Sequence, residues 1–113
     1  MKALILIDFE REWLDKKSEY YVGDISTVLR KTNQLIDFCR QKKYKLIFTR
    51  HVEKGSEGAF AENSAGVEII PVLHKKDTDV LITKHKISPF YQTTLEKELK
   101  GIKEIMVAGI LTN

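Results

Sequence analysis

Residues 3–8 read ALILID, and this stretch decides the fold. Its five consecutive apolar residues form a run of strand length, which ends at the charged residue Asp8. A strand without a polar position needs apolar neighbours on both of its faces, as the central strands of parallel sheets have. We therefore expect residues 3–7 to form a buried central strand that carries Asp8 at its carboxyl end.

The same kind of apolar run recurs along the chain, with helical patterns between the runs. Further strands are predicted at residues 45–49, 79–83 and 104–108, and helices at residues 25–42 and 91–100. A loop with three glycines spans residues 51–66, and a short further element is expected within residues 67–73. Alternating strands and helices are typical of an α/β protein with right-handed crossovers. The predicted fold is a three-layer α/β/α, Rossmann-like parallel sheet.

The composition is that of one globular domain. The chain has 113 residues and a net charge of +3, and its lysines are scattered, which argues against nucleic acid as a partner. One cysteine excludes an internal disulfide and fits a reducing cytoplasm. The N-terminal apolar run is too short for a signal peptide or a membrane span. We therefore expect a cytoplasmic protein that is not associated with a membrane.

The carboxyl ends of the strands are where ligands bind in such folds, and two charged residues are expected there. Asp8 is a helix cap, a hydrogen-bond anchor for a loop, or a catalytic carboxylate. Lys84 follows residues 79–83, and a lysine at such a place usually reaches solvent through its long stem. At neighbouring strand ends the two charges would share one crevice and hold each other ionised. The pair is either a structural ion pair or two parts of a three-part nucleophilic site that lacks its nucleophile.

Two other groups of polar side chains are weaker candidates for chemistry. Cys39 lies in register with the apolar residues of the first predicted helix, so we interpret it as a buried hydrophobic side chain rather than a nucleophile. His51 and Glu53 are spaced to reach one metal ion from a strand end, but no suitable third ligand stands out. We therefore predict no transition metal at these residues and no cofactor.

Five segments of the chain carry a resemblance to a known family. They are ALILIDFEREWL (residues 3–14), FTRHVEKG (48–55), NSAGVEIIPVL (63–73), ITKHKISPFYQTTLEKEL (82–99) and IMVAGILTN (105–113). In this order they resemble segments of the isochorismatase-like cysteine hydrolases, which include the nicotinamidases. The resemblance covers nearly the whole chain.

The resemblance implies that Asp8 and Lys84 are catalytic and that a cysteine nucleophile follows just beyond Asn113. Residues 1–113 would then be one isochorismatase-like hydrolase domain, truncated at its C-terminus and lacking its last strands and helices. A thiol at a helix N-terminus beside Lys84 would be a thiolate, and Asp8 would take and later deliver the proton. The turn before the cysteine, with a cis peptide at Ile110–Leu111 in the family's pattern, would hold the oxyanion.

The resemblance also implies a place in the substrate pocket for two aromatic residues. Trp13 and Phe90 stand where aromatic rings help to wall the substrate pocket, although ordinary core packing also explains each of them. The implied activity is hydrolysis of a small amide, ester or vinyl ether. The alternative is a catalytically silent relative or fragment that binds a ligand or a protein.

Departures from the family pattern leave the substrate open. Many members have Gln-Asn where this chain has Glu10-Arg11. Nicotinamidases carry an Asp and a His where this chain has His51 and Glu53. The chain therefore resembles the family as a whole more than it resembles nicotinamidases.

The last predicted strand, residues 104–108, bears on assembly. An apolar strand at the edge of a sheet exposes hydrophobic surface and unpaired backbone groups. Residues beyond 113 or a second copy of the chain would have to cover it. We therefore expect a homo-oligomer, a dimer or a tetramer, that binds a small-molecule substrate.

Overall fold

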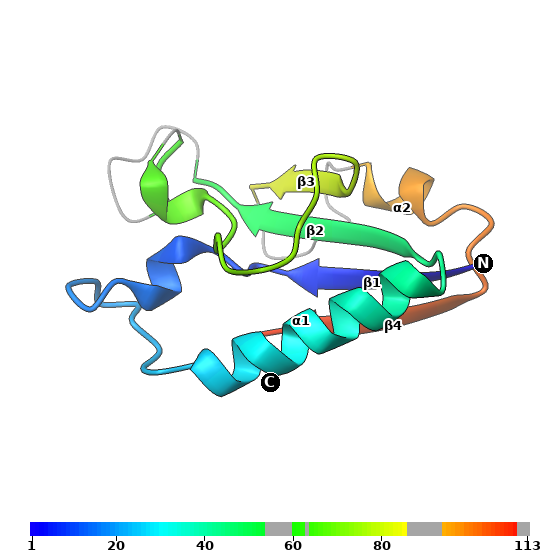
Figure 1. The fold of residues 1–113 in the computed structure, drawn as a ribbon. Coiled ribbons are helices and arrows are strands. Elements are labelled where there is room, and N and C mark those ends of the chain that lie inside the picture. Colours follow the sequence, from blue (N-terminus) through cyan, green and yellow to red (C-terminus); the bar gives the residue numbers. More distant parts are fainter. Residues whose placement is uncertain (54–59, 63, 86–93, 111–113) are drawn as a thin grey trace.

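The structure is a computed structural model, and it describes residues 1–53, 60–62, 64–85 and 94–110. These residues contain a parallel sheet with the strand order β3-β2-β1-β4 (Figure 1). Its strands are β1 (Lys2–Ile7), β2 (Lys45–His51), β3 (Val80–Lys84) and β4 (Glu104–Gly109). The helices are α1 (Ser26–Gln41) and α2 (Leu95–Glu98), with short 3-10 helices η1 (Arg11–Leu14) and η2 (Ala65–Val67). The predicted parallel α/β sheet is confirmed.

β1 is the central strand that its apolar sequence predicts. It pairs with β2 on one side and with β4 on the other. Leu4 and Leu6 are fully buried on one face, and Ile5 is 4% exposed on the opposite face. Both faces of β1 are covered between Ala3 and Ile7, which is why this part of the strand contains no polar residue.

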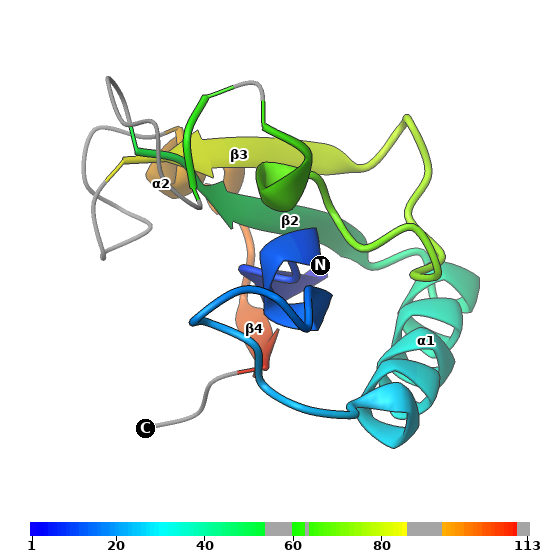
Figure 2. The ribbon, with the colours of Figure 1, turned by 90° about the vertical axis from the view of Figure 1, so that its left-hand side faces the viewer.

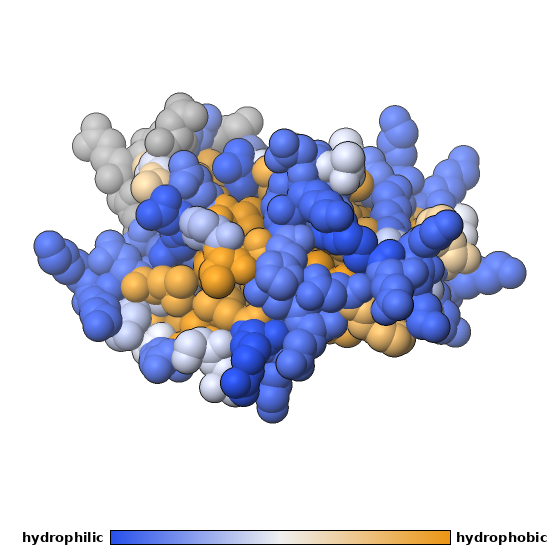
Figure 3. Space-filling model, in the orientation of Figure 1, coloured by the Kyte–Doolittle hydropathy of each residue, from blue (hydrophilic) through white to orange (hydrophobic). Residues whose placement is uncertain are grey.

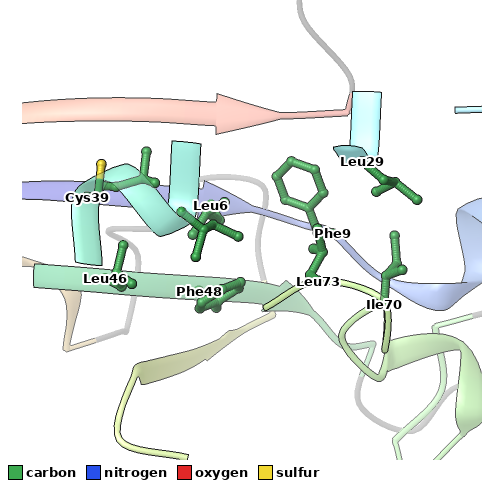
Figure 4. Close-up of a cluster of buried hydrophobic side chains, with 10 residues drawn as sticks. Leu6, Phe9, Leu29, Cys39, Leu46, Phe48, Ile70 and Leu73 are labelled. Atoms are coloured by element: carbon green, nitrogen blue, oxygen red, sulfur yellow. The ribbon is translucent and has the colours of Figure 1, made fainter. Parts of the chain in front are cut away.

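The main hydrophobic core lies between α1 and one face of the sheet. The apolar stripe of α1 packs against side chains of β1 and β2, and the segment at residues 70–73 closes one end (Figure 4). Cys39 is fully buried over Leu46, at the end of the cluster away from Phe9 and Ile70 (Figure 4). Burial raises the pKa of the Cys39 thiol. The prediction that Cys39 is a core residue is confirmed.

A second core lies on the opposite face, under α2, so the sheet has a helix on each side (Figure 2). Leu95 of α2 is fully buried against Ile5, Ile47 and Ile82. This layer does not extend over β4, because Val107 of β4 is 63% exposed. The other face of β4 packs into the main core through Met106 and Ala108. The predicted three layers are present, but one of them stops short of β4.

Two predicted elements differ from the structure. The helix predicted at residues 91–100 is described only as α2, because residues 91–93 lie outside the described ranges. The turn after α2 contains Gly101 at φ 84°, a left-handed conformation that commonly ends helices. Of the short element expected within residues 67–73, only Val67 belongs to η2, and no further helix or strand follows up to Leu73. A single antiparallel bridge joins Ile69 to Glu10 instead.

Charged and polar side chains cover most of the molecular face in Figure 3, around an area of apolar side chains. Val28 and Phe38 of α1 and the loop residue Val72 are among the exposed apolar residues. Within the described ranges, no helix has the length and apolar character that crossing a bilayer requires.

Candidate active site

Asp8 directly follows β1 in a backbone conformation that side chains seldom adopt. Its φ is 58°, in the left-handed region, which costs energy for residues other than glycine but is tolerated best by Asn and Asp. Its backbone N–H donates to the carbonyl of Thr49 at 3.1 Å, so β1 leaves the sheet immediately after this bond. Residues in such conformations concentrate at functional sites.

Lys84, the last residue of β3, reaches Asp8 across the sheet. Its Nζ donates to Oδ2 of Asp8 at 3.0 Å. The Lys84 side chain is only 3% exposed, whereas that of Asp8 is 25% exposed. The predicted meeting of the two charges is confirmed. Two related expectations are wrong: β2 lies between the two strands, and the lysine does not reach solvent.

The length of the lysine side chain explains why Lys84 reaches Asp8 across β2 and why it is buried. Neighbouring strands lie about 4.8 Å apart, so β1 and β3 are separated by about 10 Å. A four-carbon stem can cross much of that distance over β2, and its apolar length is buried on the way. A buried ammonium is costly unless it is paired. The Asp8 carboxylate provides that pairing.

Thr49 of β2 lies between the two charged residues and was not identified from the sequence. It is fully buried, and its hydroxyl Oγ1 lies 3.4 Å from Oδ1 of Asp8. Each carboxylate oxygen of Asp8 thus has a neighbour, Thr49 on one side and Lys84 on the other. The signal that could have revealed Thr49 is a polar residue that interrupts the apolar run of a central strand.

Trp13 in η1 holds the backbone of Asp8 from the other side. Its indole Nε1–H donates to the Asp8 carbonyl oxygen at 2.7 Å. The backbone N–H of Glu10 donates to the same oxygen at 2.9 Å. These two hydrogen bonds and the bond to Thr49 fix the peptide groups on both sides of Asp8. Trp13 therefore has a positioning role that the sequence did not predict, whether or not it also walls a pocket.

Trp13 belongs to an aromatic cluster near the ends of β1 and β2. Phe60 lies at its centre, with ring centroids 5.2 Å from Trp13, 5.3 Å from Tyr20 and 5.6 Å from His51. Trp13 and Tyr20 also meet edge to face at 6.2 Å. Aromatic pairs in these geometries contribute beyond their buried area. The cluster gives the segments that carry Asp8 and His51 a common apolar support.

Glu10 is a second carboxyl group close to the Asp8–Lys84 pair. It is fully buried, and its Oε1 accepts the backbone N–H of His51 at 2.7 Å. Its Oε2 is buried without a hydrogen-bond partner among the described residues. Burial raises the pKa of Glu10 to about 8, against the opposing effect of the His51 N–H. From the sequence, Glu10 was noticed only as a departure from the glutamine of many family members.

His51 and Glu53, which were weighed as metal ligands, have no third ligand beside them among the described residues. His51 Nε2 and Glu53 Oε1 are 3.6 Å apart, and in the described part of the chain no three metal-ligating side chains gather around one point. His85 Nδ1 lies 2.7 Å from the carbonyl of Val52, and His74 pairs with Asp37 at 2.9 Å. These residues do not fit a metal, and we derive no step through one. The expectation that no metal binds stays a prediction.

Other predicted site residues are only partly described. Ile110 packs its side chain against the main core, and Leu111 lies outside the described residues, so the predicted cis peptide is untested. Phe90 also lies outside the described residues. In register, Ile7 pairs with Gly109, so the segment that follows β4 starts beside Asp8.

Comparison with known proteins identifies relatives along almost the full length of the chain. A model of the isochorismatase domain matches residues 2–113. An uncharacterized isochorismatase family protein of Bacillus subtilis (strain 168), YrdC, is 29% identical over 115 residues, which cover 98% of this chain and 59% of YrdC. Nicotinamidase 3 of Arabidopsis thaliana is 27% identical over 126 residues, which cover 98% of this chain and 60% of that protein.

A solved structure gives the same picture of the fold. The cysteine hydrolase from Pseudomonas syringae pv. phaseolicola 1448A has a TM-score of 0.86 at 21% identity, covering 97% of this chain and 59% of that one. At this identity the likeness concerns the fold alone. The chain spans about three-fifths of the length of these three proteins.

Proposed function

Because this chain belongs to the isochorismatase family, we propose that it carries the acid–base half of a cysteine hydrolase site for a small amide, ester or vinyl ether. The observation that carries the proposal is the 3.0 Å contact between Lys84 Nζ and Asp8 Oδ2 at the carboxyl ends of the strands. A plain surface ion pair would not need a fully enclosed lysine or an aspartate in a left-handed conformation. Similarity to a nicotinamidase supports the reaction class.

We propose that the nucleophile is a cysteine just beyond Asn113. The pairing of Ile7 with Gly109 supports this, because a chain that leaves β4 at Gly109 passes next to Asp8. A cysteine at the start of a following helix would have a low thiol pKa, through the helix dipole and the ammonium of Lys84. The turn from Ile110 onward would present backbone N–H groups to the oxyanion.

In this mechanism Asp8 transfers protons, and Lys84 supports it. The carboxylate of Asp8 accepts the thiol proton, and the thiolate sulfur attacks the carbonyl carbon of an amide or ester. The tetrahedral intermediate collapses, the bond to the leaving amine or alcohol breaks, and Asp8 returns the proton to the leaving group. Water then hydrolyses the thioester and releases the acid and the thiol. Lys84 fixes Asp8 and stabilises negative charge throughout.

The alternative function is that of a catalytically silent relative that binds a ligand or a protein. The exposed side chains of Ile105 and Val107 favour this alternative, because they form an apolar surface on β4. A second copy of the chain could cover it, which is the basis for proposing a homo-oligomer. A cytoplasmic location is proposed from the single, buried and unpaired Cys39.

The test uses the protein translated from the complete reading frame, incubated with an activated ester of a small acid and analysed by intact mass and peptide mapping. We expect an acyl group on a cysteine beyond Asn113. Asp8→Asn should slow its formation by about 100-fold or more, the contribution of a general acid–base group. Asp77→Asn is the matched control. Asp77 is exposed and precedes β3, so it lies at the amino ends of the strands, away from Asp8. Acylation of Cys39, or an unchanged rate in Asp8→Asn, would refute the assignment.

A further inference from the structure

Glu10 is a buried carboxyl group that the proposed chemistry does not use. Oε1 has one hydrogen bond, from the His51 N–H at 2.7 Å, and Oε2 has none among the described residues. A buried carboxylate loses its hydration and needs hydrogen bonds or a cation to replace it, whereas a neutral carboxyl group loses far less. The surroundings of Glu10 decide which form is present.

Charged groups face Glu10 from each element that packs around it, and the nearby cations are engaged elsewhere. Lys84 Nζ donates to Asp8, and Arg50 Nε donates to Thr83 Oγ1 at 2.8 Å. On the flanking segments, Arg11 and Glu68 pair with each other at 2.9 Å in solvent. The charged groups that act on the Glu10 carboxyl are Asp8 after β1, Arg50 of β2 and Lys84 of β3, and the backbone N–H of His51 of β2 donates to it. Arg11 of η1 and Glu68 after η2 are the charged residues of the flanking segments.

Ionisation of Glu10 would also place a second negative charge near Asp8. The Asp8 carboxylate already faces the Lys84 ammonium at 3.0 Å. Two nearby carboxylates repel each other, and in a buried site the repulsion favours a proton on one of them. Asp8 has Lys84 and Thr49 as hydrogen-bond partners, so Glu10 is the carboxyl group that retains the proton.

We propose that Glu10 is a positioning residue held as a neutral carboxylic acid, whose Oε1 fixes the end of β2 through the His51 N–H while the proton on Oε2 leaves Asp8 as the single anion beside Lys84. The benefit to Asp8 rests on the proposed function, whereas the protonation of Glu10 does not. The neutral Glu10 thus accepts the His51 N–H as an uncharged glutamine side chain could. Unlike glutamine, it can lose a proton at high pH.

This protonation makes stability depend on pH. The Glu10 pKa rises from about 4.5 to about 8 on folding. Below about 4.5 the group is protonated in both states, and its contribution to stability is fully present. Between about 4.5 and 8 the folded state binds one more proton than the unfolded state. The folded-to-unfolded ratio therefore falls by up to about tenfold for each pH unit across this window, and levels off above it.

The experiment compares the unfolding free energies of the protein, Glu10→Gln and the matched control Glu19→Gln from pH 5 to pH 9, in urea. Glu10→Gln keeps the acceptor for the His51 N–H and cannot ionise, so we expect it to gain stability relative to the unsubstituted protein as pH rises to about 8. Glu19 is exposed, and its variant should run parallel to the unsubstituted protein. A constant difference between Glu10→Gln and the unsubstituted protein would overturn the proposal.

A second measurement needs no variant and no turnover. The side-chain carboxyl carbon of Glu10, assigned through bonds by NMR, should titrate near pH 8, and titration below pH 6 would overturn the proposal. For the positioning role, hydrogen exchange of the His51 amide should be faster by about tenfold in Glu10→Leu than in Glu10→Gln, the effect of one hydrogen bond. Equal exchange would show that Oε1 does not hold β2. Neither result depends on whether the protein is a hydrolase.

Discussion

β1 and β4 lie side by side with similar apolar sequences, yet their surroundings differ. Ile5 of β1 and Val107 of β4 are register partners on the same face of the sheet. Ile5 is 4% exposed, whereas Val107 is 63% exposed. In the described sheet β1 has a strand on each side and β4 has a strand only on one. An apolar run thus indicates the neighbours that a strand needs, and among the described residues β4 has fewer of them than β1.

The carboxyl ends of the two strands differ in the same way. β1 is followed directly by Asp8, which is held by Thr49, Trp13 and Lys84 through side-chain or backbone hydrogen bonds. β4 ends at Gly109, and Ile110 after it contributes only an apolar side chain to the core. The chain after β1 carries the proposed half of a site, and the chain after β4 begins next to it. This contrast is the physical basis for the proposal that a nucleophile follows β4.

The largest expected effect is a difference in the free energy of unfolding between alanine substitutions in β1 and in β4. Ile5→Ala removes buried methyl groups from the layer under α2 and should lower the free energy of unfolding by about 2–5 kcal/mol. Val107→Ala removes exposed groups and should change it by less than about 0.5 kcal/mol. Urea unfolding at low protein concentration measures both. Equal losses would mean that the two strands have the same surroundings in solution, and the comparison would fail.

A smaller effect is expected where β3 supports the end of β1. Lys84→Met keeps most of the buried stem but leaves the Asp8 carboxylate without its ammonium, which should cost about 1–3 kcal/mol. The cost is moderated because Asp8 is 25% exposed and water can replace part of the interaction. Lys76→Met, at an exposed lysine before β3, is the matched control and should be close to neutral. A neutral Lys84→Met would show that the pair is not a stabilising contact.

The strands and α1 could be predicted from the sequence because the apolar pattern alone determines them. The runs of β1 and β2 and the stripe of Leu29, Ile36 and Cys39 have the periods of buried strands and an amphipathic helix. The position of Asp8 at a strand end followed from the same pattern. The strand order did not, because no local feature of residues 79–83 says that β2 separates β3 from β1.

The details of the site were less predictable because they depend on contacts between distant segments. Thr49, Trp13 and Glu10 act through hydrogen bonds to Asp8 or His51, and only the folded chain brings these groups together. The burial of Lys84 likewise depends on the surrounding segments rather than on its own sequence. Trp13 had been predicted as a pocket wall or a core residue, and its hydrogen bond to the Asp8 carbonyl has no signature in the sequence.

The measurement that tests most directly whether β4 needs a further neighbour is sedimentation equilibrium of the 113-residue chain over a range of concentrations. We expect it to associate through the exposed side of β4, and Val107→Lys to weaken this association because a charge there opposes pairing. Val28→Lys, on the outer face of α1 where Val28 is 43% exposed, is the matched control and should associate normally. A chain that stays monomeric at all concentrations, with Val107→Lys unchanged from it, would contradict the view that β4 is built to be covered.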